Sequence, residues 1–144
     1  MIQRIQSLLL LASAVIFGLL FQFPLATSEQ PSVQFLSDSV FNIMDHVALL
    51  GLTIVGILLS LTAIFLFRKR SVQVRLGYFI IVVAILLPLI SFLLFTNASA
   101  EAGDVAIHDQ AGLYLPAGAI LFTLLANHFI RKDEKLVKSM DRLR

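Results

Sequence analysis

The sequence contains no cysteine and no tryptophan, and only 14% of its 144 residues are charged. Without cysteine the chain can form no disulfide, use no thiolate nucleophile and bind no metal through sulfur. Soluble domains carry about 25% charged and about 45–50% apolar residues, whereas 58% of this chain is apolar and its mean hydropathy is +0.92. A water-soluble fold of this length could not bury so much apolar surface. The composition therefore indicates a single domain embedded in lipid.

Four long apolar blocks alternate with polar segments. They cover residues 7–25, 47–67, 76–96 and 113–130, and none contains Asp, Glu, Lys or Arg. Each block is close to the roughly 20 residues that a helix needs to cross a bilayer, and backbone groups in lipid must be paired within the helix. We expect the first block to be a retained span, because it is longer than the apolar run of a cleaved leader. The pattern predicts an all-α fold, an integral-membrane four-helix bundle that forms one domain over residues 1–144.

The Lys and Arg residues all fall on one side of the predicted membrane. They occupy Arg4, the segment 68–75 between the second and third spans, and the tail 131–144, whereas the opposite side holds six acidic residues and no basic one. Short loops rich in Lys and Arg stay on the cytoplasmic side, so we expect both termini to be cytoplasmic. The net charge of +2 is too small for a nucleic-acid-binding surface, and we expect no nucleic-acid partner.

The spans carry no charged side chain and no motif that supports catalysis. Their polar residues are mainly Ser and Thr, which commonly stabilise contacts between membrane helices. The sequence contains no G-x-S-x-G, H-E-x-x-H or Walker A pattern. His46 and His108 lie near Asp45 and Asp109, but their spacing matches no known metal motif, and Asp45 also suits a helix start, where the dipole favours an anion. We expect no enzymatic activity, no cofactor and no bound metal.

Small residues spaced four apart predict where two helices approach closely. The first span contains Ala14 and Gly18, and the second contains Gly56 and Ser60. Such pairs let backbones come together in lipid, where no hydrophobic force drives helices together. Pro88 lies in the middle of the third span and predicts a kink there. We therefore expect each of these two spans to pack against a neighbouring helix through its small positions.

The tail 131–144 combines basic residues with an apolar stripe. Leu136, Met140 and Leu143 recur at i, i+4 and i+7, which predicts a cytoplasmic amphipathic helix. This helix either lies on the anionic membrane surface or docks onto a protein partner, and the sequence leaves both interpretations open. The residues expected to contact partner or lipid are Arg131, Lys132, Lys135, Leu136, Val137, Met140, Arg142 and Leu143.

Three stretches of the chain resemble one family of small membrane proteins. They are the opening MIQRIQSLLLLASAVIFGLLFQFPLA, the central LFRKRSVQVRLGYF and the closing LANHFIRKDEKLVKSMDRLR. Together they are similar to the family known as domain of unknown function 4293, and the resemblance covers essentially the whole chain. It implies a four-span protein of Bacteroidota in the inner membrane of a Gram-negative cell. The family has no established activity, so the resemblance supplies no catalytic residue.

Two functional hypotheses follow. The first is a structural or accessory subunit of a larger inner-membrane protein complex, held by the helix bundle and the basic tail, with the bilayer and unidentified membrane proteins as partners. The alternative is a small oligomeric transporter or channel. Its shared path would be lined by Thr53, Ser60, Pro88 and Ser91.

The charge distribution predicts the outcome of a topology experiment. Reporters fused after Arg144 and inserted at Arg70 should report a cytoplasmic location, and one inserted at Gly103 should report a periplasmic location. Paired alkaline phosphatase and green fluorescent protein fusions measure this directly. A periplasmic signal at Arg144 would contradict the four-span topology.

Overall fold

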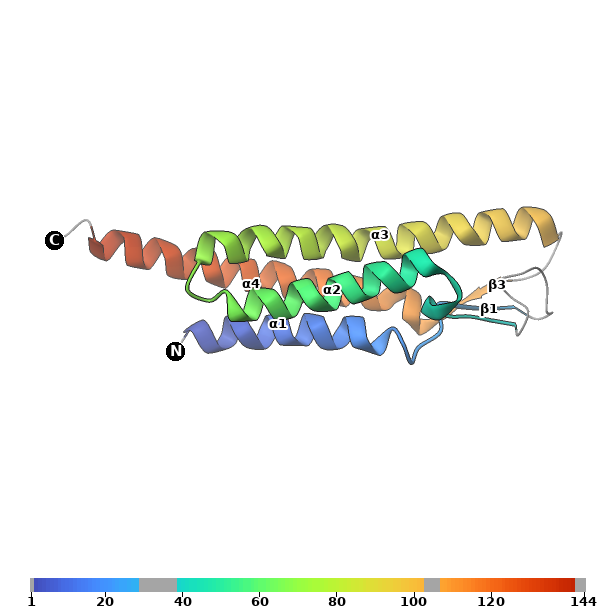
Figure 1. Cartoon of the computed structure of the whole chain (residues 1–144), viewed down its shortest axis with the longest axis horizontal. Coiled ribbons are helices and arrows are strands. Elements are labelled where there is room, and N and C mark those ends of the chain that lie inside the picture. The colour runs from blue at the N-terminus through green and yellow to red at the C-terminus, as the bar shows by residue number, and fades with distance from the viewer. Residues whose placement is uncertain (1, 29–38, 103–106, 142–144) are drawn as a thin grey trace.

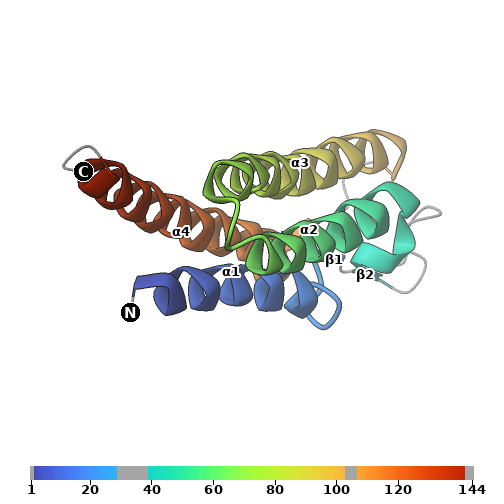
Figure 2. The same cartoon turned by 60° about the vertical axis from the view of Figure 1, so that its left-hand side comes forward.

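Four helices run side by side in alternating directions in the computed structural model, which describes residues 2–28, 39–102 and 107–141 (Figure 1). They are α1 (Ile2–Leu19), α2 (Val47–Phe65), α3 (Arg70–Ala102) and α4 (Ala111–Asp141). Each helix packs against the ones before and after it in sequence, and α1 also packs against α4. The four helices therefore form a closed ring in chain order, with α1 and α3 on opposite sides (Figure 2). This confirms the all-α bundle predicted from the apolar blocks.

Three of the helices are long and apolar enough to cross a membrane: residues 47–65 of α2, 70–97 of α3 and 111–137 of α4. Large apolar side chains cover their outer faces, including Leu58, Phe79 and Leu121, which are each more than half exposed. An apolar surface of this extent suits lipid and not water. The length of these helices and their apolar outer surface are those of a membrane protein.

The apolar part of α1, Ile5–Leu19, is shorter than the other three. At 1.5 Å per residue it measures about 22 Å, less than the roughly 30 Å of hydrocarbon. The sequence predicts a first span that continues to Leu25, but the helix ends at Leu19 because the chain turns into a sheet. There the Leu25 N–H donates to the Phe41 carbonyl (2.8 Å), and the Gln110 N–H donates to the Leu25 carbonyl (3.1 Å). A fourth crossing by α1 stays a prediction.

A small three-stranded sheet covers one end of the bundle. Its central strand β1 (Ala26–Ser28) pairs antiparallel with both β2 (Val40–Phe41) and β3 (Ile107–Asp109). Phe41 is 1% exposed and contacts Phe95 of α3 edge to face, with ring centroids 5.1 Å apart. The segment 26–46 contains apolar residues such as Val40 and Ile43, which predict a short element lying on this end of the bundle but do not identify strands. The sheet closes the bundle end by placing apolar side chains between the helices.

The predicted small positions in α1 and α2 differ in their surroundings. A Cβ added to Gly56 would lie 2.7–2.9 Å from three ring carbons of Phe17, a side chain that is fully buried. Ser60 is also fully buried, and its hydroxyl donates to the Gly56 carbonyl (2.8 Å). Ala14 is buried, but a Cβ at Gly18 would have open space around it. The close approach of α1 and α2 therefore lies at Gly56, and Gly18 does not mark one.

One hydrogen bond joins two helices deep in the bundle. The Ser13 and Thr123 hydroxyls are 3.0 Å apart, and both side chains are fully buried between α1 and α4. Thr123 donates its own proton to the Ala119 carbonyl (2.8 Å), so Ser13 is the donor to Thr123. Such contacts contribute about 0.6 kcal/mol on average in membrane proteins. This bond also fixes which residues of α1 and α4 lie opposite each other.

Replacing Gly56 by Ala should destabilise the bundle by about 1–3 kcal/mol, because the new methyl group would overlap the Phe17 ring in a packed interior. Thermal unfolding in mild detergent, followed by circular dichroism, measures the change. Gly51→Ala on the same helix is the control, since a Cβ there meets nothing within 4 Å. Equal unfolding temperatures for Gly56→Ala and wild type would contradict the contact, whereas partial rescue by Phe17→Leu would locate it.

Candidate functional site

The basic residues that the structure describes gather at the bundle end opposite the sheet. The start of α1, the connection between α2 and α3, and the C-terminal part of α4 all lie at this end (Figure 1). Arg68, Lys69 and Arg75 are exposed there on α3 or the connection before it, and Arg131, Lys132 and Lys135 are exposed on α4. The two basic segments recognised in the sequence are therefore neighbours in space. We refer to this region as the basic end.

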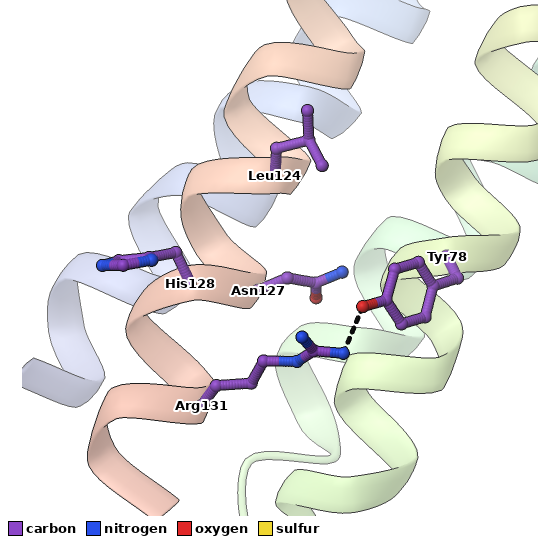
Figure 3. Close-up of a pocket in the computed structure, with 5 residues that line it drawn as sticks. All are labelled: Tyr78, Leu124, Asn127, His128 and Arg131. Carbon is purple, nitrogen blue, oxygen red and sulfur yellow. Dashed lines mark hydrogen bonds between the residues drawn. The ribbon is translucent and has the colours of Figure 1, made fainter.

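A cavity of about 160 Å³ opens between α3 and α4 at the basic end (Figure 3). It is lined by Tyr78 of α3 and by Leu124, Asn127, His128 and Arg131 of α4. A second cavity of about 420 Å³ shares His128 and Arg131 with the first and continues along α4 to Lys132 and Lys135. The α4 residues follow one face, because positions three and four apart are neighbours on a helix. We call the first cavity the α3–α4 pocket.

Arg131 and Tyr78 link the two helices across the mouth of this pocket. One Nη of Arg131 donates a hydrogen bond to the Tyr78 hydroxyl, as Figure 3 shows. The guanidinium carbon lies 5.4 Å from the centroid of the Tyr78 ring, within the range of a cation–π contact. These two contacts fix the direction of the guanidinium, although Arg131 is exposed.

An ion pair holds the same two helices together farther along the basic end. Arg70, the first residue of α3, lies 3.0 Å from a carboxylate oxygen of Asp133 on α4. Their side chains are 22% and 16% exposed. Partial burial makes this pair stronger than a fully solvated one, which contributes only about 0–1 kcal/mol. The α3–α4 pocket thus lies between the ion pair and the apolar part of the bundle.

Three buried carboxamides lie at the same level: Gln6, Gln73 and Asn127, at 4%, 1% and 4% exposure. Within the described residues, Gln6 Nε2 and both amide atoms of Gln73 and Asn127 have no hydrogen-bond partner. The Asn127 amide lies directly against Gly77, one turn beyond Gln73, and a Cβ at Gly77 would overlap it. α1, α3 and α4 thus each place a buried amide in the bundle interior at the basic end.

The position of Gln6 follows from the hydrogen bond between Ser13 and Thr123. Gln6 lies two turns before Ser13, and Ile130 lies two turns after Thr123, so antiparallel packing places Gln6 opposite Ile130. Sequence reasoning missed Gln6 and Gln73 because both lie just outside the apolar blocks. The signal that could have identified them is an amide side chain within about one turn of a span end, which recurs on three different helices.

The predicted contact residues of the tail fall into two groups. Arg131, Lys132 and Lys135 line the two cavities, Leu136 is 48% exposed and Val137 is half-buried. The Met140 side chain, Arg142 and Leu143 lie outside the residues whose placement is described. The described part of the tail is a direct continuation of α4. It is not a separate helix.

His46 and Asp45 have structural roles near the start of α2. His46, and not Asp45, caps α2: its Nδ1 accepts a hydrogen bond from the Ala48 N–H (3.2 Å). The Asp45 carboxylate lies in the short 3-10 helix η1 (Ile43–Asp45) and accepts from the Asn42 N–H (2.6 Å). Over the described part of the chain, no three His, Asp or Glu residues are grouped closely enough to hold a metal ion.

Comparison with models of known protein families identifies a match over nearly the whole chain. A family model described as Domain of unknown function (DUF4293) matches residues 2–143. That range includes all four helices, the sheet and the residues of the α3–α4 pocket. No curated protein and no solved structure matches the chain.

The buried amide of Gln73 predicts an unusual response to mutation. Gln73→Leu should raise the free energy of unfolding by about 1–3 kcal/mol, because a buried polar group without a partner carries a desolvation cost of that size. Thermal unfolding in detergent measures the effect. Gln22→Leu, at an exposed position, is the matched control and should change little. A lower unfolding temperature for Gln73→Leu would mean that the amide makes a stabilising hydrogen bond.

Proposed function

The chain belongs to the family Domain of unknown function (DUF4293), and from its geometry we propose that it is a non-catalytic accessory subunit of a larger inner-membrane protein complex. The helix bundle anchors the chain in the bilayer, and the projecting end of α4 binds the partner. The observation that carries this proposal is the continuity of α4 from Ala111 to Asp141.

The length of α4 separates the two interpretations of the basic tail. Its 31 residues extend about 46 Å, some 16 Å more than the hydrocarbon thickness. An amphipathic helix that lies on lipid must turn into the membrane plane at the interface. α4 has no break after Ile130, and its end projects past the start of α1 and of α3 (Figure 1). This direction favours docking onto a protein over lying on lipid.

The described surface of the projecting segment suits an interface. Leu136 is 48% exposed, Val137 beside it is half-buried, and both are flanked by the exposed Lys132 and Lys135. Met140 follows Leu136 by four residues in the sequence, and amphipathic helices bind protein grooves through apolar residues spaced three or four apart. A groove with an apolar floor and acidic edges would complement this segment.

The alternative function, transport through a shared path, has less support. Thr53, Ser60 and Ser91 are at most 1% exposed, and each hydroxyl donates to a carbonyl four residues earlier in its own helix. A path between copies of the chain would need such groups on the outer surface, where large apolar side chains lie instead. The burial of these hydroxyls therefore favours the accessory role.

An orientation with both termini in the cytoplasm belongs to the same proposal. The basic segments 68–75 and 131–135 lie together at one bundle end, which supports placing that end on the cytoplasmic side of the inner membrane. α1 would be the fourth span, because it packs along both α2 and α4. Its shorter apolar length is compatible with local thinning of the bilayer or with water reaching Gln6.

Two tail variants test the docking role. One permutes the charged residues of segment 131–144 around unchanged apolar positions, and the other replaces Leu136 and Met140 by Ser. Both should still insert, because the spans are intact, yet both should bind the partner at least about tenfold more weakly, as expected when an interface anchor is lost. Quantitative mass spectrometry of proteins that co-purify in stoichiometric amounts measures the loss.

Attraction to lipid gives a different pattern for the same two variants. It depends on the number of charges, at about 1 kcal/mol per basic residue, and tolerates their rearrangement. If the permuted tail retained every stoichiometric partner, the docking role would be withdrawn. A clean homo-oligomer without other subunits would favour the transport hypothesis instead.

A further inference from the structure

We propose that the α3–α4 pocket binds the phosphate group of an anionic phospholipid, with Arg131 as the principal ligand. This site lies on the bundle itself and does not depend on the proposed partner docking by the end of α4. The proposal combines the chemistry of the lining, the depth of the pocket in the membrane and the polarity along one face of α4.

The lining is rich in hydrogen-bond donors and positive charge. Arg131, Lys132, Lys135 and His128 line the two cavities, and no acidic residue is among the described lining residues. A guanidinium has five N–H donors in a planar fork that suits two phosphate oxygens. The hydrogen bond to Tyr78 engages one Nη of Arg131 and orients the remaining donors. The lining can therefore bind a phosphate monoanion in a defined geometry.

Asn127 provides an independent indication of a ligand. Its side chain is 4% exposed, lines the pocket one turn from Arg131, and has no hydrogen-bond partner within the described residues. Figure 3 shows its amide directed toward the space between α3 and α4, on the side of Tyr78 and Arg131. Burying an amide without a partner is costly. The amide lies against Gly77, and a rotation of the side chain toward Arg131 would let its Nδ2 donate to an oxygen of a ligand in the pocket.

The pocket lies at headgroup depth. Tyr78 is 44% exposed near the end of the apolar part of α3, and tyrosines of membrane proteins are enriched at the interface. Arg131 is the first charged residue after the apolar block of α4. Both groups are therefore expected beside lipid phosphates and not in bulk water.

Along one face of α4 the side chains change from apolar to polar, in the same order as the acyl chain and the headgroup of a phospholipid. Leu124 lies two turns deeper than Arg131, Asn127 and His128 lie between them, and Lys135 lies one turn beyond. The apolar Leu124 end suits an acyl chain, and the Arg131 to Lys135 end suits a headgroup. A free phosphate ion would use only the outer half of this face, so the lipid is the better match.

Lipid titration of the full-length protein tests the site. In mild detergent, native mass spectrometry and thermal unfolding should show preferential binding of phosphatidylglycerol over phosphatidylcholine. Arg131→Gln should weaken phosphatidylglycerol binding about tenfold, the effect of losing one charge-assisted contact. Arg75→Gln removes the same charge from an exposed position on α3 outside the pocket and should leave binding unchanged.

A second pair of variants keeps the test decisive if Arg131→Gln lowers stability without lipid. Tyr78→Phe retains every charge but removes the hydroxyl that orients Arg131, and it should weaken binding two- to fivefold. Tyr114→Phe, at the sheet end of α4, is its control and should have no effect.

Three results would overturn the proposal. Equal losses for Arg131→Gln and Arg75→Gln would indicate diffuse surface attraction without a site. Displacement of phosphatidylglycerol by millimolar inorganic phosphate would indicate a site for the free ion. Unchanged binding in both Arg131→Gln and Tyr78→Phe would show that the pocket is not used.

Discussion

The cost of placing a charge in hydrocarbon governs the arrangement of this protein. The apolar blocks 47–67, 76–96 and 113–130 of α2, α3 and α4 carry no Asp, Glu, Lys or Arg, and the charged residues that the structure describes lie toward the bundle ends. The polar groups that remain at depth in the described helices are mostly hydroxyls bonded within their own helix, and the Ser13 hydroxyl also bonds to that of Thr123. Cohesion between helices therefore depends on shape, and the close contact of Gly56 with the Phe17 ring is its clearest instance.

Because of the same cost, the two ends of the bundle differ in the kinds of contact that they contain. At the sheet end, backbone hydrogen bonds and apolar contacts such as that of Phe41 with Phe95 complete the fold. At the basic end, the ion pair of Arg70 with Asp133, the contact of Arg131 with Tyr78 and three buried carboxamides occur within a few turns. Polar side chains with binding capacity are therefore concentrated where the bundle meets headgroups and cytoplasm.

Much of this arrangement could be predicted from the sequence, because apolar length marks membrane helices strongly. The block 47–67 became α2, and the blocks 76–96 and 113–130 became the central parts of α3 and α4. Hydropathy marks only the part of a helix in lipid, so it could not show that α4 continues to Asp141. The sheet was missed because its strands have two or three residues each and are joined by long-range pairing. Gly18 and Gly56 look alike in sequence, and only the position of Phe17 distinguishes them.

The closed ring of helices has a consequence for the order of assembly during synthesis. α2 and α3 can each pack on the helix made just before them, but α1 gains its second neighbour only when α4, the last helix, emerges. β3, which pairs with β1, lies immediately before α4 in the chain. The Gly112 N–H at the start of α4 donates to the Pro24 carbonyl (3.0 Å), so these contacts hold the start of α4 close to the end of α1. The first of these four helices to be synthesised is thus the last of them to be fully enclosed. A nascent chain truncated before α4 would expose Ser13 and Gln6 to lipid, which is a state that membrane quality-control proteases could recognise.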